Sequence, residues 1–133
     1  MTRSMRIPST RKALQAISAF LGSFPDLMML AHERRINVQI AVTEIVTNAI
    51  IHGNRESEEL PVDISICATS SEISIIVRDY GNGFQPESLP DPRSPELREL
   101  PGGRGVFLTQ QLADAVMFEN LEPGMQVTIT FNR

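Results

Sequence analysis

The spacing of apolar residues near the start of the chain predicts a helix that follows a short strand. Helical spacing is kept by Leu14, Ile17 and Leu21. We therefore expect a helix over about Thr10–Ser23, with Ser9 or Thr10 as its N-cap. A strand over about Met5–Pro8 is expected before it.

A second, longer helix is expected from Asp26 or Leu27 through His52. Pro25 ends the first helix just before it. Two apolar stripes follow the helical period, one of Val38, Val42, Ile45 and Ala49, the other of Ile36, Ile40 and Ile50. A helix that is apolar around most of its circumference is covered on more than one side, so we predict that this one is sandwiched.

Glu44 and Asn48 interrupt the apolar surface of that helix. They are four residues apart, so they share one stripe of it. A charge among apolar stripes costs free energy unless it is paired or bound to a metal. A carboxylate and an amide one helical turn apart suit a hydrated Mg²⁺, although the period alone also allows a solvated polar edge.

Alternating apolar and polar residues predict four more strands. These are about Pro61–Cys67, Ile73–Asp79, Ala115–Glu119 and Gln126–Phe131. A hairpin connection is expected at Thr69–Glu72, and Val106–Ala113 has the pattern of a helix. We predict a single domain over residues 1–133, an α/β (α+β) two-layer sandwich whose mixed sheet carries helices on one face.

Charge and composition narrow the possible partners. The net charge of −4 argues against a nucleic-acid partner, and no apolar run reaches the roughly 20 residues of a membrane span. The basic start of the chain (Arg3, Arg6, Arg11, Lys12) loosely imitates a targeting peptide, but helical spacing favours structure, so a cytoplasmic protein is expected. The single cysteine, Cys67, cannot form an intramolecular disulfide and is expected to be a buried structural thiol.

Three short segments carry candidate chemistry, and their combination is informative. They are Glu44–Gly53, Asp79–Gly83 and Gly102–Gly105. The glycines after Asp79 let a flat ring approach the backbone, and a glycine cluster that opens a helix cradles phosphate oxygens. Together with the stripe suited to Mg²⁺, these segments could hold the metal, the base and the phosphates of a nucleotide.

Each segment alone is weak evidence. The pattern Asp-x-Gly-x-Gly is common in turns. Arg78-Asp79-Tyr80-Gly81 imitates the Asp-Phe-Gly of eukaryotic-type protein kinases, but the chain is too short for one and lacks their His-Arg-Asp and Val-Ala-Ile-Lys segments. No Gly-x-x-x-x-Gly-Lys-Ser/Thr pattern is present, which excludes a P-loop enzyme.

In their joint order and spacing, the three segments closely resemble the N, G1 and G2 boxes of the Bergerat-type (GHKL) nucleotide-binding fold. Gyrase, mismatch-repair ATPases, heat-shock chaperones and histidine kinases share this fold. A chain of this size with Glu-x-x-x-Asn-Ala-x-x-His-Gly is most similar to the bacterial anti-sigma-factor serine/threonine kinases. The resemblance spans about Met5 to Phe131.

This resemblance implies roles for individual residues. Glu44 would be the general base that accepts a proton as a serine hydroxyl attacks the γ-phosphate of ATP. Asn48 would bind Mg²⁺, which bridges phosphate oxygens. Asp79 would accept a hydrogen bond from the adenine amino group, with Gly81 and Gly83 making room for the ring.

The third box matches the family in part. Gly103 and Gly105 would present backbone N–H groups to the phosphates. Relatives often have an Arg before this box and a Ser leading into it, where this chain has Pro101 and Gly102. Either Arg104 reaches the phosphates from its different position, or charge neutralisation there is weaker.

Two further positions complete the predicted site. Many relatives have Gly-Thr before the last strand, where this chain has Gly124-Met125. The threonine contact near adenine is then missing or supplied by Thr128 or Thr130. For His52 a packing or helix-end role is expected.

The segment Phe84–Pro101 has no periodic pattern. Five of the nine prolines lie in it, namely Pro86, Pro90, Pro92, Pro95 and Pro101. Such long loops are uncommon in compact domains. Its place between two glycine boxes predicts a lid over the nucleotide, the alternative being a merely mobile loop.

The family resemblance also implies partners. The expected function is a Mg-ATP-dependent serine/threonine kinase, a homodimer that binds a sigma factor and phosphorylates a serine of an anti-anti-sigma (STAS-type) protein. The alternative is a nucleotide-binding regulatory module without phosphotransfer, and the presence of Glu44 favours the kinase. A histidine-kinase catalytic domain is a third possibility, but no helical hairpin with a phosphoacceptor histidine precedes the first box.

Overall fold

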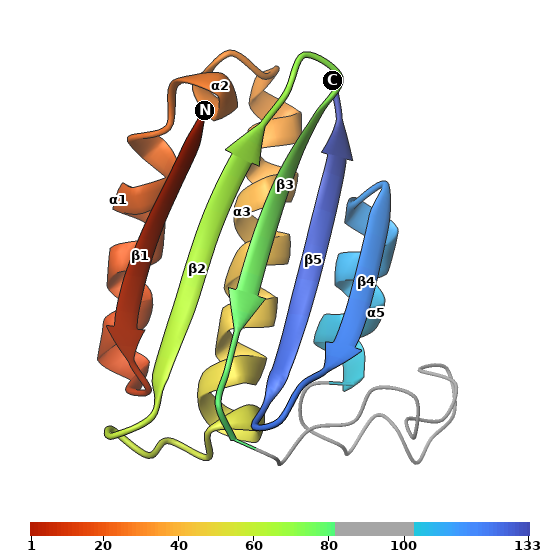
Figure 1. Cartoon of the computed structure of the whole chain (residues 1–133). Coiled ribbons are helices and arrows are strands. Elements are labelled where there is room, and N and C mark those ends of the chain that lie inside the picture. The colour runs from red at the N-terminus through yellow and green to blue at the C-terminus, as the bar shows by residue number, and fades with distance from the viewer. Residues whose placement is uncertain (82–102) are drawn as a thin grey trace.

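A five-stranded sheet with helices packed on one face forms the protein, as a computed structural model shows for residues 1–81 and 103–133 (Figure 1). In spatial order the strands are β1 (Thr2–Pro8), β2 (Pro61–Ala68), β3 (Glu72–Arg78), β5 (Met125–Asn132) and β4 (Ala115–Asn120). The predicted two-layer sandwich is confirmed. The sheet is not mixed, however, because each pair of neighbouring strands runs antiparallel.

The helical layer has more breaks than the apolar pattern predicted. It consists of the 3₁₀ turn η1 (Arg11–Leu14), α1 (Gln15–Gly22), α2 (Pro25–Met28), α3 (His32–Asn48), the π-helical turn η2 (Ala49–Gly53) and α5 (Gly103–Leu112). The N-cap prediction is confirmed at Thr10, whose hydroxyl accepts a hydrogen bond from the Ala13 amide at 3.3 Å.

The predicted continuous helix up to His52 is wrong at its start, where α2 ends at Met28 and α3 begins at His32. The run from Leu27 to Leu30 is apolar at every position, and consecutive residues cannot share one helix face. The break lets Leu27 enter the core while Met29 points to solvent.

The core lies between the sheet and the helices. Its largest fully buried side chains include Ile64, Ile66, Ile73, Ile75, Ile129 and Phe131 from the strands and Ile17, Phe24, Val38, Ile45 and Ile50 from the helical layer. Burial of each such side chain contributes about 1.5–3 kcal/mol. The alternation of buried and half-buried residues along β2, β3 and β5 follows directly from the sequence pattern.

The prediction of a sandwiched helix is wrong for half of α3. Ile36 and Ile40 are 43% and 38% exposed, and of their stripe only Ile50 is buried. The sheet covers one side of α3 and α5 packs beside it, but the described residues leave its outer side open. Cys67 is half-buried on the uncovered face of the sheet, so the expectation of a buried thiol is also wrong.

Both ends of the chain lie at the same end of the sheet, opposite the end at which β3 finishes (Figure 1). Arg3 donates a hydrogen bond to the carbonyl of Ser23 at 2.5 Å. Arg133 pairs with Asp26 at 3.1 Å. Both termini are therefore close to α2.

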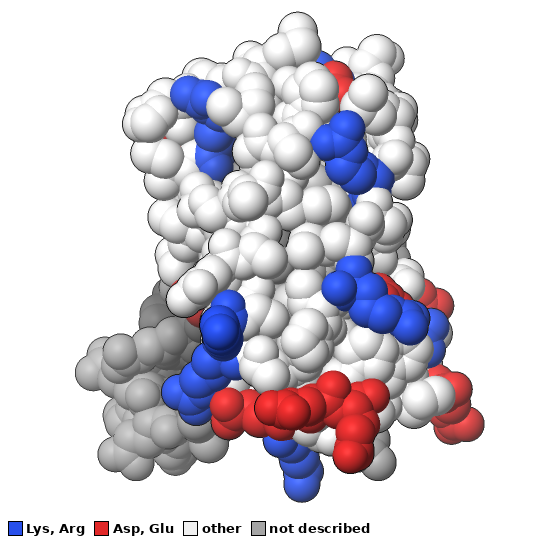
Figure 2. Space-filling view, turned by 90° about the vertical axis from the view of Figure 1, so that its left-hand side faces the viewer, with Lys and Arg blue, Asp and Glu red and all other residues white. Residues whose placement is uncertain are grey.

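Charged side chains are unevenly distributed over the side formed by β1 and α1. Figure 2 shows acidic side chains gathered at its lower end, where the connection from η2 to β2 lies. The rest of the surface in this view is largely uncharged and carries scattered basic side chains. Within residues 1–81 and 103–133, none of the helices has the length and apolar character needed to cross a membrane.

Candidate functional site

Asp79 is a buried carboxylate at the end of β3. It is 6% exposed, and its Oδ1 accepts hydrogen bonds from the backbone amides of Gly81 at 3.2 Å and Met125 at 3.3 Å. Burial raises the pKa of Asp79 to about 6, against the opposing effect of these two hydrogen bonds and of the Arg78 charge. Its second oxygen is not engaged by these amides, which suits it to accept a hydrogen bond from a ligand.

Two glycines allow η2 to press against this carboxylate. A Cβ atom on Gly53 would lie 2.3 Å from Asp79 Oδ2, and one on Gly81 would lie 1.8 Å from the carbonyl oxygen of Gly53. A side chain at position 53 would displace the Asp79 carboxylate, and one at position 81 would require a backbone shift. The space at Gly81 is therefore used by the protein's own backbone, whereas the sequence had suggested space for a ring.

Asn54 joins three separate segments of the chain next to the end of β3. It is buried, and its Oδ1 accepts a hydrogen bond from the Tyr80 amide at 2.9 Å. Its Nδ2 donates to Ser9 Oγ at 2.8 Å and to the Pro61 carbonyl at 3.0 Å. Sequence reasoning missed this residue, because an Asn after a glycine reads as an ordinary turn.

Tyr80 fixes the outer side of the same strand end. Its hydroxyl donates a hydrogen bond to Asp63, and the Arg78 guanidinium lies 4.7 Å from its ring centroid. Arg6 pairs with Asp63 at 2.6 Å, and hydrogen bonding from Arg6 holds the pKa of that carboxyl below its usual range. These contacts anchor the residue next to Asp79 on the uncovered face of the sheet.

Asn48 and Glu44 lie one turn apart on α3, as predicted. Asn48 is 5% exposed, and its Nδ2 has no hydrogen-bond partner among the described residues. A buried amide without a partner costs free energy, so a ligand is the natural partner. Rotation of the amide by half a turn would present its oxygen to a cation instead. Glu44 is half-buried and borders a groove on the outer side of α3.

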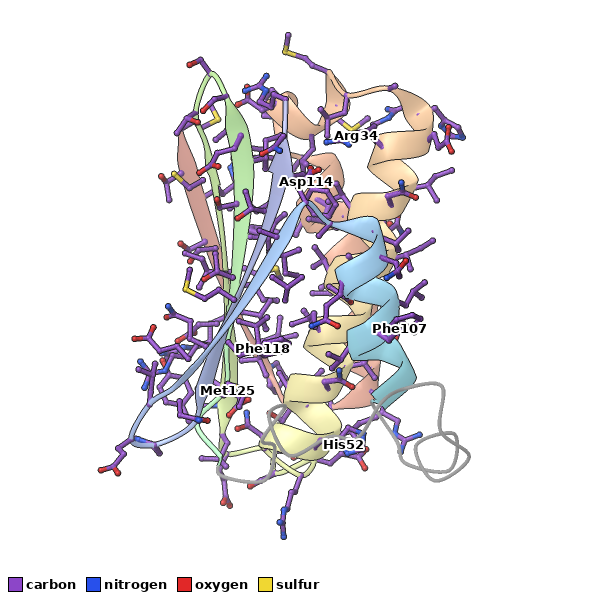
Figure 3. All side chains as sticks on the ribbon, turned by 90° about the vertical axis from the view of Figure 1, so that its right-hand side faces the viewer. Arg34, His52, Phe107, Asp114, Phe118 and Met125 are labelled. Atoms are coloured by element: carbon purple, nitrogen blue, oxygen red, sulfur yellow. The ribbon has the colours of Figure 1, made fainter. Side chains whose placement is uncertain are left out.

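η2 connects Asn48 directly to the Asp79 pocket. It runs from the end of α3 to Gly53, which contacts the carboxylate. His52 lies on this turn, at the same end of the molecule as Met125 (Figure 3). Partial burial lowers the pKa of His52, which favours the neutral imidazole.

Other predicted site residues fall elsewhere or outside the described part. Thr128 points to the uncovered sheet face, where it pairs with Ile76 and Met117, so the structure does not bring it to Asp79, and Thr130 faces the same way. The Met125 amide makes the contact to Asp79 instead. The backbone of Gly103 to Gly105 begins α5, as a phosphate-binding helix start requires. Gly83, the side chain of Arg104, and the predicted lid Phe84–Pro101 with Gly102 lie outside the described residues.

A helix carrying an acid and a buried amide, next to a buried aspartate in a glycine-lined strand end, defines a nucleotide-binding protein of the Bergerat type. The family model of the histidine kinase-like ATPase domain matches residues 7–131. The chain belongs to this family, and ATP is the nucleotide that such a domain binds.

Curated relatives place the chain among the anti-sigma-factor serine kinases. The anti-sigma F factor of Clostridium perfringens is 34% identical over 76% of this chain and 71% of its own length. The serine-protein kinase RsbW of Bacillus subtilis is 28% identical over 95% of this chain and 82% of its own length. RsbW of Oceanobacillus iheyensis is 26% identical over 87% and 77%, respectively.

Solved structures agree on the fold. A structure of the RsbU and RsbW domains of a Mycobacterium tuberculosis protein superposes with a TM-score of 0.69 at 14% identity, covering 100% of this chain and 33% of that one. The histidine kinase domain of a blue-light activated kinase from Erythrobacter litoralis gives a TM-score of 0.58 at 20% identity, covering 90% of this chain and 57% of that one.

Proposed function

We propose that this chain is a Mg-ATP-dependent serine/threonine kinase that acts as an anti-sigma factor and phosphorylates a serine of an anti-anti-sigma partner. The observation that carries the proposal is the pair of Glu44 and the buried Asn48 on one stripe of α3, where Asn48 Nδ2 has no hydrogen-bond partner among the described residues. The names of the relatives, serine-protein kinase and anti-sigma F factor, support the same reading.

The chain's own residues would divide the work as follows. Asp79 accepts a hydrogen bond from the adenine amino group, in a pocket shaped by Gly53 and Gly81. Asn48 holds the Mg²⁺ that accompanies ATP through its side-chain oxygen. Half a turn of the amide presents this oxygen in place of Nδ2, which has no hydrogen-bond partner among the described residues. Gly83 makes room beside the adenine.

The phosphates and the transfer step need the start of α5 and Glu44. Backbone N–H groups of Gly103 and Gly105 bind phosphate oxygens at the helix start, and we assign Arg104 the role of contributing positive charge to the same phosphates. Bound ATP supplies the γ-phosphoryl group. Glu44 takes the proton of the serine hydroxyl while the serine oxygen forms its bond to phosphorus and ADP leaves.

The partners follow from the same family. We propose that residues 1–133 act as one catalytic domain in the cytoplasm, as a homodimer that binds a sigma factor until an anti-anti-sigma (STAS-type) protein competes for it. We propose that these partners bind the surface of this domain. Arg6 and Arg11 are already paired with Asp63 and Glu56, so the basic start of the chain offers less free charge than its sequence suggests.

Incubation of the purified chain with labelled ATP, Mg²⁺ and an anti-anti-sigma candidate encoded beside it tests the proposal. With the wild-type chain, label should appear on a serine of the candidate. With the Glu44→Gln variant, the candidate should remain unlabelled. ADP binding without transfer to any candidate would instead support the regulatory module without phosphotransfer. Absence of nucleotide binding would refute both.

A further inference from the structure

A groove that the described residues leave uncovered follows the outer side of α3, and we call it the α3 groove. Its upper part, about 290 Å³, lies between α1, α2 and α3 and is lined by Leu21, Leu27, Met28, Arg35 and Ile36, among others. Its lower part, about 250 Å³, is lined by Ile36, Gln39, Ile40, Thr43 and Glu44. Because Ile36 and Gln39 border both parts, the two parts adjoin along α3, and the lower part ends at Glu44.

The apolar side chains of this track are exposed at regular spacing. Ile36, Ile40, Glu44 and Asn48 follow one another at intervals of four residues, so they form one stripe along α3. Single exposed apolar residues are ordinary on protein surfaces. Here Ile36 and Ile40 are both exposed and lie on the same stripe as Glu44, the proposed general base. The half-exposed Met28 lines the upper part of the groove.

Arg35 gives the upper part of the groove a positive charge without a carboxylate partner among the described residues. Its Nη1 lies 4.0 Å from the sulfur of Met28, and its Nη2 lies 3.5 Å from His32 Nδ1. Its Nε is buried and has no hydrogen-bond partner in the described part of the chain. The neighbouring Arg34, in contrast, pairs with Asp114 at 3.4 Å. A carboxylate is the group that a guanidinium in this situation binds best.

We propose that the α3 groove docks the protein substrate, through a segment that carries an apolar and an acidic residue beside the serine to be phosphorylated. This inference rests on the proposed kinase function. The two parts lie one after the other along α3, so successive side chains of a docked protein segment can occupy them.

The charges of the groove fix the direction of the docked segment. Its acid binds Arg35, and its serine lies at the opposite end, because the Glu44 carboxylate would repel the acid. Arg35 precedes Glu44 by nine positions, which corresponds to roughly 13 Å along a helix. The apolar residue lies between them on Ile36 and Ile40. The groove thereby selects which serine is presented to Glu44.

A synthetic peptide library tests this docking with the full chain and ADP present. Each fluorescein-labelled peptide contains one serine, and Leu and Asp are moved through the flanking positions while anisotropy measures binding. Peptides with both residues on the same side of the serine should bind best. Ile40→Ser should weaken their binding by roughly tenfold or more, as for the central residues of an interface. Met117→Ser is the matched control, because Met117 is 64% exposed on the opposite face of the sheet and should leave binding unchanged.

A charge exchange separates docking from a structural role of Arg35. Arg35→Glu should lose the preference for Asp and gain one for Lys at the same peptide position. Equal binding of all peptides, or an unchanged preference in Arg35→Glu, would overturn the proposal. Conversion of a wild-type dimer to a monomer by Ile36→Glu in sedimentation would also overturn it, since a second copy would then occupy the groove. Calorimetry with ADP and a phosphotransfer assay with labelled ATP and the anti-anti-sigma candidate, both on the same preparations, test the nucleotide site and the kinase function separately, so a failure of docking is distinguished from a failure of either.

Discussion

Gly53 lies directly against Asp79, so close that a methyl group at position 53 would be 2.3 Å from the carboxylate oxygen. This contact joins the end of η2 to the end of β3, and with it the first predicted box to the second. Since the carboxylate is held by two backbone amides, it cannot move away without loss of hydrogen bonds.

Gly53→Ala should therefore destabilise the fold and disturb the adenine position. We expect a loss of about 1–3 kcal/mol in the free energy of unfolding, the usual cost of overpacking, and weaker ADP binding. Gly22→Ala is the matched control, because nothing lies within 4 Å of the added methyl group there. Urea unfolding and calorimetry measure both effects, and a Gly53→Ala variant as stable as Gly22→Ala would contradict the contact.

ADP affinity should fall at acid pH because Asp79 has its pKa near 6. Only the ionised carboxylate is a pure acceptor for the adenine amino group. Affinity should be constant well above this pKa and then drop, by up to roughly tenfold for each pH unit below it. The Asp79→Asn variant has no carboxyl group to titrate at this position, whereas any titration of the ADP phosphates is the same in both proteins. The pH dependence of ADP affinity should therefore be smaller in the variant. Identical pH profiles for the two proteins would exclude Asp79 as the adenine acceptor.

Asp79 should also make the protein less stable as the pH rises. Its pKa of about 6 in the folded chain lies above the roughly 3.9 of an unfolded aspartate. Between these values the folded state binds more protons, so the free energy of unfolding falls as the pH rises through this range and stays lower above it. Asp79→Asn should be more stable than the wild type near neutral pH, by at most about 3 kcal/mol. The difference should vanish below both pKa values, and urea titrations at the two pH extremes can check it.

Glu44 and Asn48 should differ in what their removal costs. Glu44→Gln should keep ADP affinity within a few-fold while phosphotransfer drops by roughly 10²–10⁴-fold, the contribution of a positioned base. Asn48→Ala should instead lose the part of the affinity that depends on Mg²⁺. Calorimetry with and without Mg²⁺, beside single-turnover transfer, separates these outcomes. Full transfer activity in Glu44→Gln would remove the residue from the proton-transfer step.

The apolar–polar period predicted the strands well, because neighbouring residues of a strand point to opposite faces of the sheet whatever the rest of the fold is. The residues from Val62 to Val77 show which strand face enters the core, and the structure agrees. The same alternation, followed one strand further, already places Thr128 on the face away from Asp79. Of the two alternatives that the family resemblance left open, the alternation therefore favours a missing threonine contact over one supplied by Thr128 or Thr130.

Which sides of a helix are buried depends on the elements that pack against it, so the sequence of the helix alone does not determine its buried sides. Ile36 and Ile40 look like core residues by spacing, yet the described part of the fold places nothing over them. Likewise, Asn54 holds its pocket together through contacts to Ser9 and Tyr80, which are distant in sequence. Such contacts appear only when the chain is folded.

The position of the termini matters for how binding experiments are built. Arg3 and Arg133 tie the two ends of the chain to Ser23 and Asp26, on either side of the start of α2. An affinity tag at either end would begin near α2, whose residues Leu27 and Met28 line the upper part of the α3 groove, and could shield the groove from a partner. The same tag would start about 23 Å, the length of a seven-residue strand, from Asp79. The tag should therefore leave the measured nucleotide affinity unchanged. For experiments on partner binding, the tag should be cleaved off before the measurement.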